Sequence, residues 1–485
     1  MNQIVTSEKT PYYYFFIKEK EYNLFGLQHD GVYYWQLIRF ALLKSITVKN
    51  LHVAGKSTKR NYKDEIAGAF KESKRMQHLF NSAEQADVIR IRPCVTVSKE
   101  GTLDDHQYDY VSLNCSFFDL YTLGNYCNIP QCVKYDMACA EKKLILWKLK
   151  RKVFGGNSIL NEQSLILKAF LEDVNKMYGM CFDVEELKRQ ISYSVHCHKY
   201  YVEEFNKVFS IVKPKLIFVY PHYDEHMFAA MEAARQIGIK SIEMQHGRIN
   251  AHEAYWYEDQ TPIGKVLPDY FFTYGEWWNE KIQMPYFCKP IAVGNPYLES
   301  QLELYPRKNH LVGTTITVLS NTQNGKVLSE FIYELRDFII DNNISILYKL
   351  HPNERNSWKE EYPLLHQLPN TRIVDDNTSA YNLLAESNIA IGINSTLFYE
   401  ALAYDGIRLF IYTIGDYEGM KPLIESGVAE PVISSNDLKA KIALKSTTEV
   451  INNAVFWKRE SEKNMVKQVN TILQDGEIYG NEQKQ

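Results

Sequence analysis

The sequence predicts an α/β protein in which two Rossmann-like domains face a cleft and a long C-terminal helix follows them. Apolar strand segments alternate with helical patterns on both sides of a polar stretch at 297–312. Polar loops follow several of these strands, and ligands of open α/β sheets bind outside the carboxyl ends of the strands. The pattern therefore predicts one active site assembled from distant segments.

The composition is typical of a large globular protein without a strongly charged partner. The chain has 485 residues, a formal net charge of −4, 16 prolines and 23 glycines. The length suggests two to four domains, and the sparse Pro and Gly argue against long disordered linkers. No global basic field calls for nucleic acid, and no acidic block indicates a disordered tail.

Local sequence patterns indicate where in the cell the protein resides and whether it binds a metal. Residues 1–9 lack the basic-then-apolar plan of a signal peptide, and no apolar run approaches the ~20 residues of a spanning helix. We therefore expect a cytoplasmic protein whose eight cysteines are reduced. Cys127, Cys132 and Cys139 lack zinc-ribbon spacing, and 196–198 is too compact to chelate one ion well, so we expect no metal site.

The first domain, at 1–296, is weakly patterned until a compact βαβ unit near its end. Before that unit, 86–91 and 109–113 have the character of short strands, and apolar residues at helical spacing predict helices in 60–85 and 155–210. The unit itself consists of a strand at 215–220, a helix from Asp224 to Ile237, Gly238 as its C′ residue and a strand at 239–244. Such a unit implies parallel strands with a right-handed crossover.

A second strand and helix series forms the domain predicted at 313–445, after further strands at 270–274 and 291–293 and the linker. Residues 446–485 are expected to form the C-terminal helix and tail. The predicted strands are 315–319, 344–350, 373–374, 388–393 and 409–412, and the predicted helices are 326–341, 381–386, 397–404 and 449–473.

Ser395 and Thr396 lie between a predicted strand and a predicted helix. Unpaired N–H groups and the positive end of the dipole make such a helix start a site for phosphate, and the two hydroxyls can donate to phosphate oxygens. The alternative is ordinary N-capping, which Ser and Thr provide in many helices. Glu400, one turn further along, can reach a ribose hydroxyl or simply face solvent.

Lys349 and His351 flank the end of the 344–350 strand, and Pro352 restricts the backbone of His351. Both side chains can donate hydrogen bonds to a phosphate leaving group and stabilise the charge that develops on it. We also expect Ser320, at the end of the 315–319 strand, to contact the donor phosphate.

The neighbouring Asn321 is expected to contact the nucleotide.

A second polar loop, in the first domain, offers a candidate general base. His246 follows the 239–244 strand and precedes Gly247, whose backbone permits close ligand approach. The alternative is a structural histidine bonded to a carbonyl. Asp224, with Glu225 and His226, is a rival base at the same predicted edge.

The stretch 142–154 is basic and amphipathic. It can lie on an anionic membrane surface, which predicts peripheral contact with the inner membrane. The alternative is a solvated helix with one apolar face packed on the core.

The chain resembles GT-B glycosyltransferases of bacterial surface-polysaccharide synthesis in three motifs over roughly 213–430. These are Gln-His-Gly at 245–247, Lys-x-His-Pro-Asn-Glu at 349–354 and Ser-Thr-x-x-x-Glu-Ala-Leu at 395–402. The His-Pro group is similar to that of capsule Kdo transferases, bacterial sialyltransferases and CDP-glycerol glycerophosphotransferases.

The resemblance implies transfer of a sugar from a nucleotide-sugar donor to a surface glycan or lipid-linked glycan, without a metal or other cofactor. It implies that His351, Ser395 and Thr396 contact the donor phosphate, that Glu400 binds the ribose, and that His246 lies at the reaction centre. Sialyltransferases of this type carry an acidic-acidic-Gly base motif, whereas 104–106 here is Asp-Asp-His, so the catalytic base is open.

Two other functions remain compatible with this pattern. A hydrolysing nucleotide-sugar 2-epimerase shares the two-domain architecture, and a non-catalytic nucleotide- or glycan-binding protein of an assembly complex needs only the binding residues, since fold does not fix function.

Overall fold

A computed structural model shows two compact α/β units. It describes residues 12–50, 110–112, 126–128, 161–212, 216–219, 222–223, 225–245, 247–249, 257, 266–285, 287–308, 313–415, 417–444 and 453–482. Unit 1 comprises Met1–Thr273, Asn279–Ile291 and Met465–Gln485, and unit 2 comprises Tyr274–Trp278 and Ala292–Asn464. Each unit is described by itself below.

Unit 2 is built on a parallel sheet that, in its described residues, has six strands in the order β11-β10-β9-β12-β13-β14. All five neighbouring pairs are parallel. Numbered along the chain, this is the Rossmann order 3-2-1-4-5-6. The strands are β9 (Thr315–Leu319), β10 (Ser345–Lys349), β11 (Thr371–Val374), β12 (Ile389–Gly392), β13 (Arg408–Tyr412) and β14 (Glu430–Val432).

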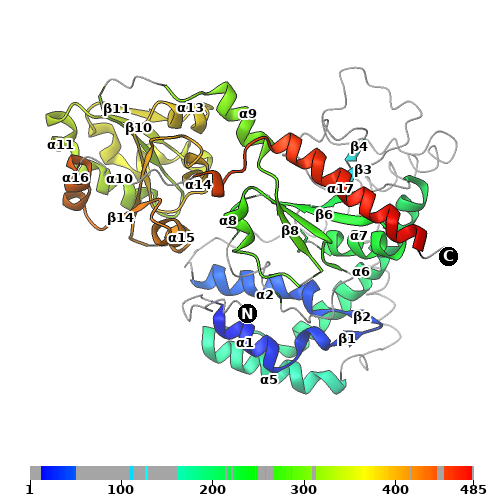
Figure 1. Ribbon diagram of the computed structural model, residues 1–485. Coiled ribbons are helices and arrows are strands. Elements are labelled where there is room, and N and C mark those ends of the chain that lie inside the picture. The colour runs from blue at the N-terminus through cyan, green and yellow to red at the C-terminus, as the bar shows by residue number, and fades with distance from the viewer. Residues whose placement is uncertain are drawn as a thin grey trace, which may run out of the picture. The chain divides into compact units, whose positions relative to one another are not determined.

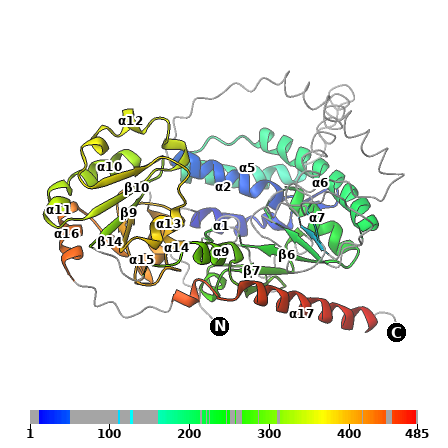
Figure 2. The same ribbon diagram turned by 90° about the horizontal axis from the view of Figure 1, so that it is seen from above.

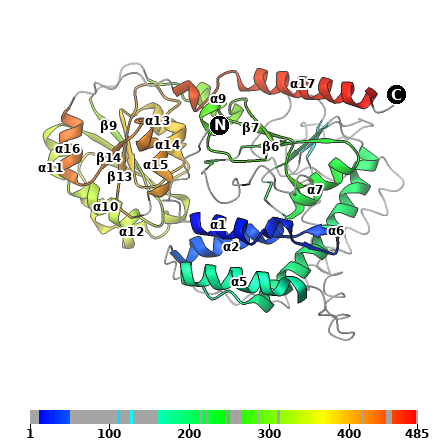
Figure 3. The ribbon, with the colours of Figure 1, turned by 60° about the horizontal axis from the view of Figure 1, so that its bottom comes forward.

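Helices cover both faces of this sheet (Figure 3). One face carries α10 (Gly325–Tyr333), α11 (Arg336–Asp341), α12 (Trp358–Glu361) and α16 (Ser435–Ala443), and the other carries α13 (Ala380–Ala385), α14 (Leu397–Ala401) and α15 (Lys421–Glu425). On the first face, Leu328, Phe331 and Leu438 pack with Tyr348 in one buried core. The helices thus change face where the strand order reverses, between β9 and β12.

Two predicted helices of unit 2 are wrong in length. The helix predicted at 326–341 is divided at Leu335, whose N–H bonds the Ile332 carbonyl three residues back at 3.0 Å. The helix predicted at 397–404 ends at Ala401, after which the N–H groups of Ala403 and Tyr404 also bond carbonyls three residues back, at 3.0 Å each. Such tight turns keep the apolar spacing of a helix, so periodicity alone does not reveal the break.

The segment predicted as a linker at 297–312 instead begins with a helix, α9 (Pro296–Leu304). The Asn295 side chain accepts the Leu298 N–H at 3.2 Å as an N-cap, and Pro296 occupies the first turn, where its missing N–H costs nothing. These start signals outweigh the polar composition that favoured a linker.

Residues 274–278 belong to unit 2 because aromatic packing ties them to the segment before the last helix. The Trp278 indole donates to the Phe456 carbonyl at 2.8 Å, and the Tyr274 ring stacks on Trp457 with centroids 5.0 Å apart. No alanine fits at Gly275, where a Cβ would lie 2.4 Å from the Val455 carbonyl oxygen. This division differs from the domain boundaries predicted at 296 and 313.

Unit 1 also contains a six-stranded sheet within the described residues, in the order β4-β3-β5-β6-β7-β8. The neighbours β4–β3, β3–β5, β5–β6 and β6–β7 are parallel. The strands are β3 (Tyr110–Ser112), β4 (Tyr126–Asn128), β5 (Leu216–Val219), β6 (Lys240–Met244), β7 (Tyr270–Thr273) and β8 (Lys289–Ala292). The predicted βαβ unit at 215–244 is confirmed, and with unit 2 it confirms two Rossmann-like units.

Helices α6 (Val184–Val212) and α7 (Glu225–Gln236) lie against each other in Figures 1 and 2. Gly238 ends α7 with a φ of +80°, as predicted for a C′ residue. A separate core joins α1 (Tyr13–Glu21), α2 (Trp35–Asn50) and α5 (Asn161–Tyr178), which Figure 1 shows side by side.

The C-terminal helix predicted at 449–473 is α17, and it runs from Ser461 to Glu482. The helix predicted at 60–85, the strand at 86–91 and the basic stretch 142–154 lie outside the described residues. No helix in the described ranges has the length and hydropathy needed to cross a membrane.

Candidate functional site

The loops after β9, β10 and β12 leave the same edge of the unit 2 sheet. Leu319 pairs in register with both Lys349 and Gly392, so the residues that follow these three positions emerge together. Strand order reverses between β9 and β12, and the crevice at such a switch point is where open α/β sheets bind ligands. The structure thus places Ser320, His351 and Ser395 on one edge, as the sequence indicates.

The two loops at the switch point are joined directly by Asn321. Its side-chain N–H donates to the Asn394 carbonyl at 2.7 Å, and its side-chain oxygen accepts the Asn324 N–H at 2.9 Å. The Asn321 amide therefore holds the loops in place. Its predicted contact with the nucleotide stays a prediction.

Glu354 lies at the centre of this edge and is only 1% exposed. One carboxylate oxygen accepts the hydroxyl protons of Ser320 at 2.9 Å and Tyr362 at 2.8 Å, and the other accepts the His351 N–H at 2.6 Å. Ser320, predicted to contact phosphate, thus donates to Glu354 in the structure. Sequence reasoning missed Glu354; the signal was a capping box, with Glu354 two residues after Pro352 at the start of a short 3₁₀ turn.

Gly325, the first residue of α10, makes room for the Glu354 carboxylate. A Cβ there would lie 2.2 Å from both a Glu354 carboxylate oxygen and the Tyr362 hydroxyl.

We expect Gly325→Ala to lower the free energy of unfolding by about 1–3 kcal/mol, because overpacking would push the carboxylate from its three donors. Chemical denaturation of the variant measures this loss. Gly313→Ala is the reference for a glycine substitution without steric overlap. Its φ of +81° strains a side chain, but the nearest atom to an added Cβ lies 3.9 Å away. A Gly325→Ala loss no larger than that of the reference would remove the steric argument.

The His351 ring is oriented by its own loop. Nδ1 accepts the Asn353 N–H at 3.2 Å, which in a neutral ring leaves the proton on Nε2. Nε2 has no hydrogen-bond partner within the described part of the chain. The half-buried His351 therefore presents an N–H donor at the sheet edge, as a phosphate contact requires.

Lys349 is half-buried at the end of β10. Burial lowers the pKa of its ammonium group, the nearby Arg355 lowers it further, and Asp376 opposes both. Two cations near one another, one of them partly desolvated, favour an anionic ligand between or beside them. The anion would offset both the desolvation of Lys349 and its repulsion by Arg355.

Ser395 and Thr396 lead into α14. The Ser395 hydroxyl oxygen accepts the Leu397 N–H at 3.3 Å, the capping role considered as the alternative, and its own proton stays available for donation. Thr396 is exposed and makes no side-chain cap bond. Since α14 has only five residues, its dipole contributes little, and the hydroxyls remain the stronger argument for phosphate.

Glu400 faces α13, where its carboxylate accepts the Tyr381 hydroxyl proton. Burial raises the pKa of Glu400, and this hydrogen bond opposes the shift. Its predicted contact with a ribose stays a prediction. His246 and Asp224, the predicted bases, lie outside the described residues, as do the side chains of Glu225 and His226.

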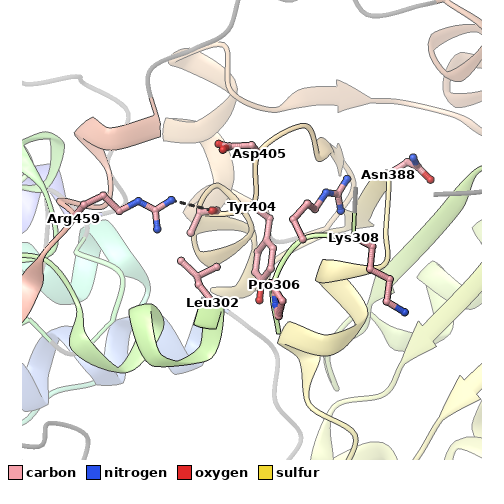
Figure 4. Close-up of a pocket in the computed structure, with 9 residues that line it drawn as sticks. Leu302, Pro306, Lys308, Asn388, Tyr404, Asp405 and Arg459 are labelled. Atoms are coloured by element: carbon pink, nitrogen blue, oxygen red, sulfur yellow. Dashed lines mark hydrogen bonds between the residues drawn. The ribbon is translucent and has the colours of Figure 1, made fainter. Parts of the chain in front are cut away.

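A pocket of about 630 Å³ lies at the opposite edge of the unit 2 sheet (Figure 4). Asn388, which lines it, directly precedes β12, so the pocket is at the amino ends of the strands. Arg307 lines it as well and donates to the Leu384 carbonyl at 3.0 Å, near the end of α13. The lining residues are Leu302, Pro306, Arg307, Lys308, Asn388, Ala403, Tyr404, Asp405 and Arg459.

The described residues show no cluster of metal-ligating side chains. In the ranges that the structure describes, no group of three or more His, Cys, Asp or Glu side chains is arranged to hold an ion.

A model of the LIC12162 family transferases matches residues 186–406, somewhat less than half of the chain. This range includes all the candidate residues at the carboxyl edge of unit 2. No curated protein is significantly similar to the chain.

Among solved structures, UDP-GlcNAc 2-epimerase from Methanocaldococcus jannaschii is similar at 15% identity and a TM-score of 0.40, over 57% of this chain and 82% of that one. MurG from Acinetobacter baumannii shares 10% identity at a TM-score of 0.38, over 57% and 78%. The glycotransferase of kitacinnamycin shares 9% identity at a TM-score of 0.39, over 76% and 94%. The chain thus resembles a transferase family, and its strand orders are those of two Rossmann-like units.

Proposed function

We propose that this protein is a glycosyltransferase that takes its sugar from a nucleotide-sugar donor. Unit 2 binds the donor at the carboxyl edge of its sheet, and unit 1 binds the acceptor. The observation that carries the proposal is the His351 loop, which presents an Nε2–H donor beside the switch point between β9 and β12. Lys349 and Ser395 add a cation and a hydroxyl at the same edge.

The chemistry required of these residues is stabilisation of a leaving phosphate. An acceptor oxygen forms a bond to the anomeric carbon, the bond from that carbon to the phosphate oxygen breaks, and its electron pair leaves with the nucleotide. Donors fixed in place before the reaction stabilise this charge without reorganisation. Glu354 fixes the His351 backbone, and the Asn353 N–H fixes its ring.

We further propose that the acceptor is a growing surface polysaccharide or a lipid-linked glycan. Support comes from the ordered motifs at 245–247, 349–354 and 395–402, which resemble those of surface-polysaccharide glycosyltransferases. The basic stretch 142–154 supports peripheral contact with a membrane that carries such an acceptor.

A thermal-shift series with CMP, CDP, UDP and GDP tests donor binding. A nucleotide that binds only the folded protein stabilises it by about 2.7 kcal/mol at a hundredfold excess over its Kd. We expect one nucleotide to raise the melting temperature of the wild type and to do so less in Ser395→Ala. No shift with any nucleotide or nucleotide-sugar would count against the proposal. Release of UDP and ManNAc from UDP-GlcNAc without acceptor would favour an epimerase instead.

A further inference from the structure

A buried histidine–glutamate pair lies at the carboxyl edge of the unit 1 sheet. His222 follows β5 by three residues, and Glu243 is in β6, in register with Val219. Both side chains are 0% exposed. The pair therefore lies where parallel α/β sheets place their ligands, at the end of two neighbouring strands.

The pair has the geometry of an oriented base. One Glu243 oxygen accepts the His222 backbone N–H at 3.2 Å, and the other lies 2.6 Å from ring Nδ1. A carboxylate at Nδ1 keeps the proton on that nitrogen, so Nε2 carries the lone pair. The Tyr257 hydroxyl lies 3.3 Å from Nε2, at the long end of hydrogen-bond distances.

The groups around His222 determine which partner donates in each hydrogen bond. Tyr257 also hydrogen-bonds Arg39, whose guanidinium lies 5.0 Å from the phenol ring centroid. Burial raises the pKa of Tyr257, which keeps its hydroxyl as a donor. Arg39 in turn donates to Glu19 at 2.5 Å. The bonds thus run from Arg39 to Tyr257, to His222 and to Glu243.

Cys288 is a further titratable residue near the pair. The buried Cys288 thiol feels the Glu243 charge, and its pKa is raised first by burial and then by that charge. Rings of Tyr223 and Phe228 contact the imidazole edge-on, with centroids 5.5 and 6.2 Å from it.

A second buried pair in the same unit provides a comparison. His198 on α6 is 1% exposed, and its Nε2 lies 2.8 Å from a Glu232 oxygen on α7. It joins two packed helices, and among the described residues its other ring nitrogen, Nδ1, has no hydrogen-bond partner. Among the described residues, only the His222 pair lies at a sheet edge and aligns a carboxylate, an imidazole and a hydroxyl in that spatial order. This is the arrangement that activates a hydroxyl nucleophile.

We propose that His222, oriented by Glu243, takes the proton from the acceptor hydroxyl. This inference rests on the glycosyl transfer proposed above and supplies the base that reaction requires. The acceptor hydroxyl takes the place of the Tyr257 hydroxyl at Nε2. Its proton moves to Nε2 as its oxygen bonds to the anomeric carbon, and the nucleotide departs with the electron pair.

The test compares His222→Gln, Glu243→Gln and the double variant with His198→Gln in the full-length protein. The double variant removes the buried charge together with the imidazole, so it folds without leaving an anion unpaired. Three quantities are measured for each: the melting temperature, the nucleotide affinity by calorimetry, and the transfer rate at saturating donor and acceptor.

We expect His222→Gln and the double variant to lose about 10²–10⁴-fold in transfer rate, the usual contribution of a general base, with nucleotide affinity unchanged. Glu243→Gln should also lower the transfer rate with nucleotide affinity unchanged, because the ring loses the carboxylate that orients it. His198→Gln should lose stability yet keep the wild-type transfer rate.

Two results would overturn the inference alone. One is a folded His222→Gln or double variant that transfers within about threefold of the wild type, far below a general base's contribution. The other is a folded Glu243→Gln variant that transfers at the wild-type rate. A wild type that binds no nucleotide and transfers no sugar would instead refute the proposed function.

Discussion

His351→Asn is expected to reduce sugar transfer by about 10²–10³-fold, the effect of removing one preorganised donor to developing charge. Asparagine can still accept the Asn353 N–H, so the loop keeps its turn, but nothing replaces Nε2–H. His351→Gln places an amide N–H close to the lost donor and should recover part of the rate. Steady-state rates at saturating donor and acceptor measure both variants.

His366→Ala is the matched control for these substitutions. His366 is exposed in the same unit, and its ring stacks on Trp358 with centroids 4.7 Å apart. Its loss should leave transfer unchanged. Equal rates for the wild type and His351→Asn would show that His351 has no role at the leaving group.

Glu354→Leu is expected to lower the free energy of unfolding by about 3–5 kcal/mol, because three donors, two of them buried, lose their shared acceptor. Glu354→Gln should cost only about 1–2 kcal/mol, since the Ser320 and Tyr362 hydroxyls can rotate to accept from the new amide. Denaturant unfolding measures both values.

Glu354 also has a predicted effect on binding that a purely structural residue would not have. In Glu354→Gln the His351 N–H loses a charged acceptor, so the affinity for nucleotide should fall while the fold persists. Glu361→Gln, an exposed change on α12, serves as control and should alter neither quantity. Unchanged nucleotide affinity in a folded Glu354→Gln would restrict Glu354 to stability.

Local sequence was sufficient to predict the strands that carry the site. The run before His351 is apolar and ends in Lys-Leu-His-Pro, and β10 occupies Ser345–Lys349 as expected. The same holds for β12, where Ile389–Gly392 leads to Asn394 and Ser395. Parallel strands in an α/β order bring such ends to one edge, so the grouping followed from the fold class.

The role of Glu354 depended on tertiary contacts that no local pattern contains. Its partners Ser320 and Tyr362 come from the β9 loop and a 3₁₀ turn, and Gly325 clears its space from α10. His222 was hidden for the same reason: a single histidine after a strand has no meaning until Glu243 and Tyr257 are placed around it.

Helix lengths were hard to predict for a different reason. Turns with bonds three residues back preserve apolar spacing, as beyond Ala401, so the pattern overestimates the helix. The strand order β11-β10-β9-β12 followed from the predicted Rossmann-like fold class and from no local pattern, because the pairing of β9 with β12 joins segments far apart in the chain.

A crystal structure with the nucleotide that gives the largest thermal shift tests donor binding at the carboxyl edge of unit 2 most directly. The account predicts a phosphate oxygen within hydrogen-bond distance of His351 Nε2 and of the Ser395 hydroxyl. A phosphate bound instead at the opposite edge, in the pocket lined by Arg307 and Arg459, would contradict it.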